Sequence, residues 1–231
     1  MRKENQQHVN GVSSFIRDIV YGANDGIITT FAVVAGVAGA SLDSGAVIIL
    51  GLANLAADGF SMAASNYLGS RSERQLMEKE YLSEEQEVAQ MPGQEQKEVR
   101  DIFLEHGYNI QDSQIMSELI KKNKPFWLNF MMRYELGFNP DQKNSLRSAY
   151  FTFLAFVVAG FLPLAPFIFF PGADIFKVSA VATGLALFMV GALRYLVTGK
   201  HWLVSGLEML FVGGIAASIA YFIGLIISRI V

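Results

Sequence analysis

Two long runs without a charged residue most constrain what this chain can fold into. Residues 148–173 are 26 consecutive positions without Asp, Glu, Lys or Arg, and residues 209–228 are 20 more. An α-helix needs about 20 predominantly apolar residues to cross the hydrocarbon core of a bilayer. Only 17% of all residues are charged, against roughly 25% in soluble domains. The chain is therefore predicted to be an integral membrane protein.

The charged residues divide the chain into three predicted parts. Residues 70–147 carry 11 Lys/Arg and 14 Asp/Glu, too much charge for a segment that crosses a bilayer. Their apolar residues recur at helical spacing, and Pro92, Gly107 and Pro125 separate the predicted helices. We therefore predict a small helical domain, inserted between two apolar parts. The predicted domains are residues 1–69, 70–147 and 148–231.

The two apolar parts contain the predicted transmembrane helices. The predicted fold is an all-α integral membrane protein with five transmembrane helices, in which the helical domain is inserted between the second and the third. A turn signal, "GASLDSG", separates the first two helices. The predicted spans are 18–40, 44–69, 148–170, 176–197 and 205–228.

The distribution of Lys and Arg predicts the orientation, because short cytoplasmic loops carry an excess of these residues. Arg2, Lys3 and Arg17 precede the first span, and Arg194 and Lys200 flank the loop between the fourth and fifth. The loops on the other side hold a single lysine. The N-terminus and the 70–147 domain are therefore predicted to lie in the cytoplasm, with the C-terminus across the membrane.

Several classes of function are not supported. The net charge of −3 argues against a nucleic-acid partner, and no G-x-x-x-x-G-K-[ST] loop is present for ATP-driven transport. None of the three histidines follows a glutamate at the spacing of a ferritin-type di-iron site. The N-terminus does not read as a signal peptide, and the absence of cysteine leaves the redox compartment open. We predict no enzyme activity and no cofactor.

Carboxylates inside the predicted spans are the first candidate site. Asp25 lies in the first span and Asp58 in the second, with no basic residue nearby in the sequence to pair with either. An ionisable group at membrane depth is costly, roughly 2.5–3.5 kcal/mol, and usually faces a cavity or an ion. Asp18, seven residues before Asp25, falls on the same helix face. Asp18 has an alternative interpretation as a helix cap or a partner of Arg17.

The residues around Asp58 bear on which ion would bind. Met62 lies one helical turn after Asp58, and Asn54 one turn before it. Carboxylates alone suit protons, Na⁺, Mg²⁺ or Ca²⁺, whereas a thioether favours a softer divalent ion such as Fe²⁺. A lone methionine in a span more often serves packing, so the residues by themselves leave the ion open.

The inserted domain holds a second acidic group. Eight glutamates and only three Lys/Arg lie between positions 73 and 98, and a chain break at "QMPGQ" would fold one acidic helix back on the next. A solvated, salt-bridged helix face is the ordinary interpretation of such a run. The alternative is a divalent-cation site. Its candidate ligands are Glu84, Glu87, Glu95, Glu98, Met131, Met132 and Glu135.

Four segments in this order resemble the vacuolar iron transporter (CCC1-like) family. They are "RDIVYGANDGIITTFAVVAGVAGA", "GLANLAADGFSMAASNYLGSRSE", "PFWLNFMMRYELGF" and "AGFLPLAPFIF". The resemblance implies a five-span homodimer that moves Fe²⁺, and in some members Mn²⁺, out of the cytosol in exchange for protons. It places the protein in a vacuolar-type membrane if eukaryotic and in the cytoplasmic membrane if prokaryotic.

The resemblance also implies roles for particular residues. Asp25 and Met62 match the family's metal ligands within the membrane, and Asp18 matches an acidic position nearer the cytosolic mouth. The candidate ligands of the 70–147 domain match its cytoplasmic metal-binding residues. Where the family often has a glutamate, this chain has Asn54, so we expect Asp58 to supply the displaced charge. The alternatives are a membrane-anchored metal buffer or sensor without transport, and a channel or scaffold without metal selectivity.

Overall fold

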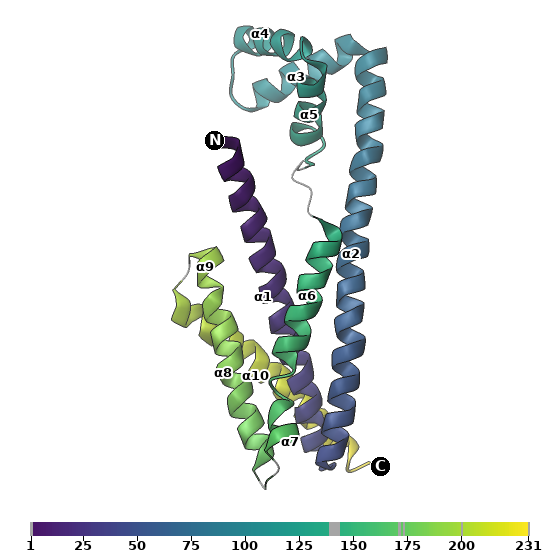
Figure 1. Ribbon diagram of the computed structural model, residues 1–231. Coiled ribbons are helices and arrows are strands. Elements are labelled where there is room, and N and C mark those ends of the chain that lie inside the picture. Colours follow the sequence, from purple (N-terminus) through teal and green to yellow (C-terminus); the bar gives the residue numbers. More distant parts are fainter. Residues whose placement is uncertain (1, 139–143, 171, 173, 200, 231) are drawn as a thin grey trace. The chain divides into compact units, whose positions relative to one another are not determined.

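The computed structural model describes residues 2–138, 144–170, 172, 174–199 and 201–230, except for the side chains of residues 2–15, 197 and 198. Arg2 and Lys3, used above for the orientation, are among these exceptions. The described chain divides into two compact units, residues 1–68 with 144–231 and residues 69–143. Each unit is described by itself, and Figure 1 shows their helices.

The first unit is built around α1 (Arg2–Gly39), which packs against α6 (Ser145–Gly160) and α10 (Trp202–Ile227). The helix α8 (Ile175–Leu193) packs against α10 and α1, and the short α9 (Tyr195–Thr198) follows it. The first part of α2 (Ser44–Gln90) contributes Val47 and Leu55 to a buried cluster with Phe156 and Leu164.

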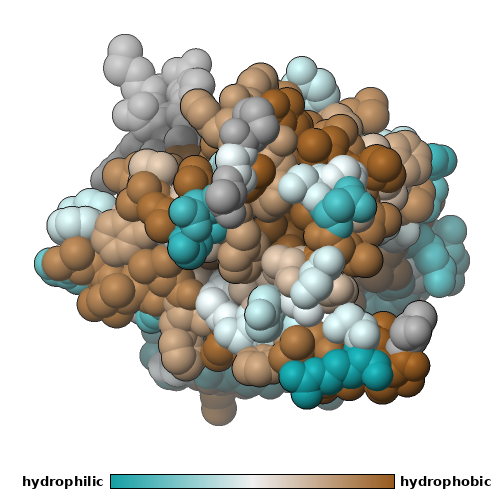
Figure 2. All heavy atoms as spheres, turned by 90° about the horizontal axis from the view of Figure 1, so that it is seen from below, coloured by the Kyte–Doolittle hydropathy of each residue, from teal (hydrophilic) through white to brown (hydrophobic). Residues whose placement is uncertain are grey.

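Four helices in the described residues are long and apolar enough to cross a membrane. They are Ile16–Gly39 of α1, the helix α2, α8 and α10. The helix α6 is apolar but shorter. Large apolar side chains of α8 and α10 are exposed, among them Val181, Leu185 and Phe211. The view in Figure 2 shows apolar atoms over much of one face. These features are those of a multi-pass membrane protein.

Two helix boundaries differ from the predicted ones. The second helix was expected to end at residue 69, but α2 continues to Gln90, because Glu, Lys, Arg and Gln limit membrane insertion without disfavouring a helix. The expected span 148–170 is interrupted between α6 and α7 (Ala165–Phe169). Pro163 lies at this break, because proline cannot donate a helical hydrogen bond, and Pro166 lies in the first turn of α7, where that bond is not needed. The Ser179 hydroxyl donates to the Pro163 carbonyl at 2.6 Å.

Close packing of α1 on α6 depends on a glycine. A Cβ at Gly26 would collide with the backbone carbonyl of Phe156. Gly26→Ala should therefore destabilise the protein by about 1–3 kcal/mol, because the backbone of neither helix can yield without loss of packing. Thermal unfolding in detergent measures this effect. Gly69→Ala is the matched control, since nothing lies within 4 Å of a Cβ there, and unchanged unfolding of Gly26→Ala would contradict the prediction.

The second unit contains the end of α2, α3 (Pro92–Glu105), α4 (Ile110–Lys121) and α5 (Lys124–Tyr134). These helices match the segments expected from the sequence. Pro92 is in the first turn of α3, and Asn109 caps α4 by accepting a hydrogen bond from the Asp112 N–H at 2.8 Å. The buried core of this unit includes Val88, Val99, Ile120, Trp127, Leu128, Phe130 and Met131.

Candidate metal centre

Three glutamates of the second unit bring their carboxylates together. Glu84 lies on α2, Glu95 in the first turn of α3, and Glu135 directly after α5. One carboxylate oxygen of each residue lies within 4.8 Å of the others. Oxygen ligands at about 2.0–2.6 Å from a cation can be up to about 5 Å apart. One divalent ion could therefore contact all three residues.

Two of these residues are buried, and three of their four carboxylate oxygens have no hydrogen-bond partner within the described structure. The side chains of Glu84 and Glu95 are 4% and 1% exposed. Glu84 Oε1 and both carboxylate oxygens of Glu95 have no partner within the described structure. A buried charge is costly unless it is paired or coordinates a metal. Glu85, the sequence neighbour of Glu84, instead has its Oε1 2.9 Å from Lys124 Nζ.

The acidic residues shift one another's protonation. Burial raises the pKa of Glu84 to about 8, and repulsion from Glu135 and Glu95 adds to this shift. Burial also raises the pKa of Glu135 to about 7, with Glu98 next in importance, and it raises the pKa of Glu95. The charge of Glu87 contributes to all three shifts. All five acidic residues expected in this site thus interact electrostatically.

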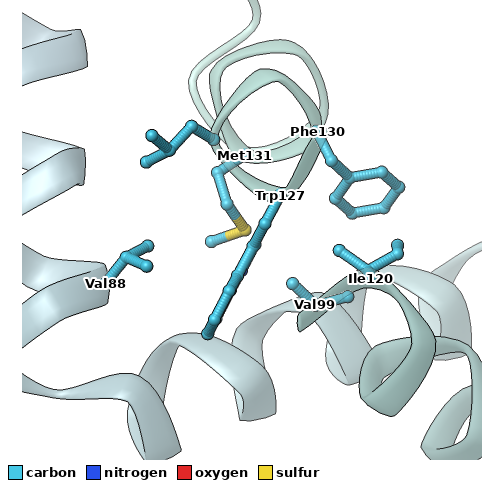
Figure 3. Close-up of a cluster of buried hydrophobic side chains, with 7 residues drawn as sticks. Val88, Val99, Ile120, Trp127, Phe130 and Met131 are labelled. Atoms are coloured by element: carbon cyan, nitrogen blue, oxygen red, sulfur yellow. The ribbon is translucent and has the colours of Figure 1, made fainter. Parts of the chain in front are cut away.

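The two methionines predicted for this site are buried. Met131 is fully buried and Met132 is 5% exposed. The thioether of Met131 lies between Val88 and Trp127 in the core of the unit, as Figure 3 shows. Met131 therefore contributes to packing, and its role as a metal ligand remains a prediction, as does that of Met132. The salt-bridged helix face considered above does not describe Glu84 and Glu95, because both are buried.

The candidate residues of the first unit lie on two helices, α1 and α2. Asp25 on α1 is half-buried, and the charge of Asp58 on α2 acts on it. The two carboxylates therefore interact electrostatically. Met62 is half-buried and packs against the cluster that contains Leu55 and Phe156. Asp18 is buried and accepts a hydrogen bond from the Ser148 hydroxyl of α6 at 2.5 Å.

Comparison with known protein families assigns the chain to one of them. The model of the VIT family matches residues 16–225, a range that includes both groups of acidic residues. The chain belongs to the VIT family. The iron-transporter resemblance seen in the sequence is thereby confirmed, and a transporter rather than an enzyme is indicated.

Several members of the VIT family are similar over most of this chain. "Vacuolar iron transporter 1" of Arabidopsis thaliana is 37% identical over 208 residues, which cover 89% of this chain and 83% of that protein. "Vacuolar iron transporter" of Toxoplasma gondii is 35% identical over 240 residues, 99% of this chain and 79% of its own length. "Vacuolar iron transporter 1" of Eucalyptus grandis is 34% identical, covering 89% and 84%.

Sequence reasoning on this VIT-family chain missed the surroundings of Asp18. Ser148 and Thr152 were not singled out, whereas Asn66 was interpreted as a residue that hydrogen-bonds between helices, as it does with Thr152 at 3.0 Å. Ser148 lies 130 residues from Asp18 in the chain, so no local spacing could have paired them. The only local signal was a short polar residue in a predicted apolar span, which most often reflects helix packing.

Proposed function

We propose that this protein is a secondary active transporter that exports Fe²⁺, and also Mn²⁺, from the cytosol in exchange for protons. One observation carries the proposal: buried, unpartnered carboxylate oxygens of Glu84 and Glu95 meet Glu135 in a protein with several apolar membrane helices. Membership of the VIT family, with relatives named as iron transporters, supports iron as the cargo.

In this proposal the 70–147 domain lies in the cytosol and collects the ion. Carboxylate oxygens of Glu84, Glu95 and Glu135 bind it, Glu87 and Glu98 add negative charge, and Met131 and Met132 supply thioethers. Divalent iron and manganese both accept oxygen ligands, and sulfur favours the softer ion. The membrane is a vacuolar-type membrane in a eukaryote or the cytoplasmic membrane in a prokaryote.

The path through the bilayer uses Asp25, Asp58 and Met62, with Asp18 nearer the cytosolic end. Five helices span the membrane, α6 among them, and two copies of the chain form a homodimer. The charge of Asp58 acts on Asp25, and Asp58 would supply a second negative charge for a divalent ion. Protons that enter from the other side compete for the same carboxylate lone pairs, which releases the metal.

Metal uptake into proteoliposomes with an imposed pH gradient tests the transport proposal. The reconstituted wild-type protein should accumulate Fe²⁺ under anaerobic conditions, and Mn²⁺ in air, when the inside is acidic. A proton-sensitive dye should report proton movement in the opposite direction. Flux without metal selectivity would instead indicate a channel, and absence of flux in correctly folded protein would contradict the proposal.

The raised pKa values predict how metal binding depends on pH. A ligand must lose its proton to bind a cation, and Glu84 and Glu135 have pKa values of about 8 and about 7. Lowering the pH from 8 to 6 should therefore weaken Mn²⁺ affinity on the order of 10²- to 10³-fold, since two protons must then be displaced. Calorimetric titration of the full-length protein in detergent measures this, and an affinity constant between these pH values would contradict it.

A metal buffer or sensor without transport is the second candidate function. The glutamate cluster lies entirely within the second unit, which has its own buried core, so metal binding there does not require a membrane path. The two candidates differ in one measurement. Stoichiometric Mn²⁺ binding by the full-length protein together with no metal flux in the proteoliposomes would favour the buffer.

A further inference from the structure

A buried polar network joins three helices of the first unit around Asp18. The Ser148 hydroxyl of α6 lies 2.5 Å from Asp18 Oδ2 on α1 and 3.2 Å from Asn66 Oδ1 on α2. The Asn66 amide donates to Thr152 Oγ1, also on α6, at 3.0 Å. Asp18, Ser148 and Thr152 are 8%, 7% and 0% exposed. Side chains from α1, α2 and α6 thus share one set of contacts.

The number of protons decides which contact of Ser148 is strongest. A serine hydroxyl has a single proton to donate, and an ionised carboxylate can only accept. Two acceptors, Asp18 Oδ2 and Asn66 Oδ1, compete for this proton. The shorter distance and the negative charge both favour Asp18, because hydrogen bonds to an ionised group are shorter and stronger. The Ser148 hydroxyl is therefore directed at the carboxylate.

Asn66 and Thr152 restrict the position of Ser148. Ser148 and Thr152 are four residues apart on α6, so both face the same side of the helix. Asn66 contacts both of them from α2, which bridges one turn of α6. A side chain held in this way keeps its rotamer, and the Asp18 carboxylate is oriented in turn. At known metal sites, residues that hydrogen-bond to a metal ligand orient that ligand in the same way.

From these contacts we propose that Ser148, supported by Asn66 and Thr152, is a positioning residue for Asp18 in metal uptake. The inference rests on the proposed transport function, in which Asp18 lies on the ion path ahead of Asp25. Ser148 acts through Asp18 and does not itself contact the ion. Its loss affects how well the metal is captured, whereas the later steps at Asp25 continue.

Kinetics of Mn²⁺ uptake in proteoliposomes test the role of Ser148. Ser148→Ala should raise the KM for Mn²⁺ about tenfold, the fold-change expected from loss of one hydrogen bond to a charged group, with the maximal rate within about twofold of wild type. Thr152→Val keeps the side-chain volume but removes the hydroxyl, and should raise the KM by a smaller factor. In an Asp18→Asn background, Ser148→Ala should add little further change, because its partner is already altered.

Ser145→Ala is the matched control. Ser145 is one turn earlier on α6, is 5% exposed, and its hydroxyl has no hydrogen-bond partner within the described structure. Its KM should equal that of wild type. Suppose that the wild type transports Mn²⁺. If Ser148→Ala and Thr152→Val then keep the wild-type KM, or if the changes in KM caused by Asp18→Asn and Ser148→Ala simply add, the inference about Ser148 is wrong. The transport proposal stands in either case. Absence of flux in the wild type would overturn the transport proposal.

Discussion

Asp25→Ala should reduce proton-driven metal flux by about 10²-fold or more. A divalent ion that leaves water inside a bilayer needs negative charge beside it, and an unpaired charge at that depth costs several kcal/mol. A loss of about 3 kcal/mol corresponds to roughly 10²-fold. Asp58, whose charge acts on Asp25 in the wild type, remains in this variant, but a single carboxylate leaves a divalent ion half-neutralised. Uptake of Fe²⁺ or Mn²⁺ into proteoliposomes is the measurement.

Three further variants sharpen this prediction. Asp58→Asn should also lower flux, because it removes the second charge, and Met62→Leu should lower Fe²⁺ uptake more than Mn²⁺ uptake, because it keeps the volume but removes the thioether. Asp174→Ala is the control, since Asp174 is exposed and paired with Lys177 at 2.7 Å. Wild-type rates for both Asp25→Ala and Met62→Leu would show that the ion takes another path.

Replacing the buried glutamates should produce opposite changes in metal affinity and stability. The combined Glu84→Gln and Glu95→Gln variant should lose Mn²⁺ affinity by about 10²-fold or more, since neutral amides replace two anionic ligands. The same variant should unfold at a temperature a few degrees higher at pH 8 without metal. Calorimetric titration and thermal unfolding of the full-length protein measure the two changes.

The stability change follows from the direction of the pKa shifts. The folded state raises the pKa of Glu84 from 4.5 to about 8, so folding favours its protonated form. In the metal-free protein, the contribution of Glu84 to the free energy of unfolding is therefore largest below about pH 4.5. This contribution is lost as the pH rises through about 8. A neutral glutamine has no such cost at pH 8. The higher unfolding temperature of the glutamine variant should disappear at pH 5, because Glu84 is then protonated in the folded wild-type protein.

Glu85→Gln provides a matched control on the same helix. Glu85 is adjacent to Glu84, but its carboxylate is partly exposed and paired with Lys124. Surface ion pairs contribute about 0–1 kcal/mol, so this variant should keep the metal affinity and nearly the stability of the wild type. An equal loss of affinity in Glu85→Gln would mean that overall negative charge, and not the buried cluster, attracts the metal.

The sequence predicted the helices of the second unit well but not all boundaries of the first. Pro92, Gly107 and Pro125 interrupt helical spacing in ways that leave few alternatives. Charge, in contrast, marks where a span should leave the bilayer and says little about where a helix ends, so the continuation of α2 to Gln90 was not expected. The break at Pro163 was missed because apolar composition was given more weight than proline.

The candidate site was predictable only where its residues are close in the sequence or match a family pattern. The pairs Glu84 with Glu87 and Glu95 with Glu98 each lie on one helix face. Glu135 was added to them as an acidic residue arriving from another helix, and the structure places its carboxylate beside Glu84 and Glu95. Burial could not be read from composition, since a run of glutamates is usually solvated.

The glycine contact between α1 and α6 bears on how an ion could be exposed first to one side of the membrane and then to the other. At Gly26 the two backbones are so close that an added Cβ would meet the Phe156 carbonyl, so a shift of one helix against the other would change this contact directly. We therefore expect Asp25 to move together with α6. Alternating access would then come from displacement of other elements, such as the first part of α2, whose Leu55 belongs to the same buried cluster as Phe156.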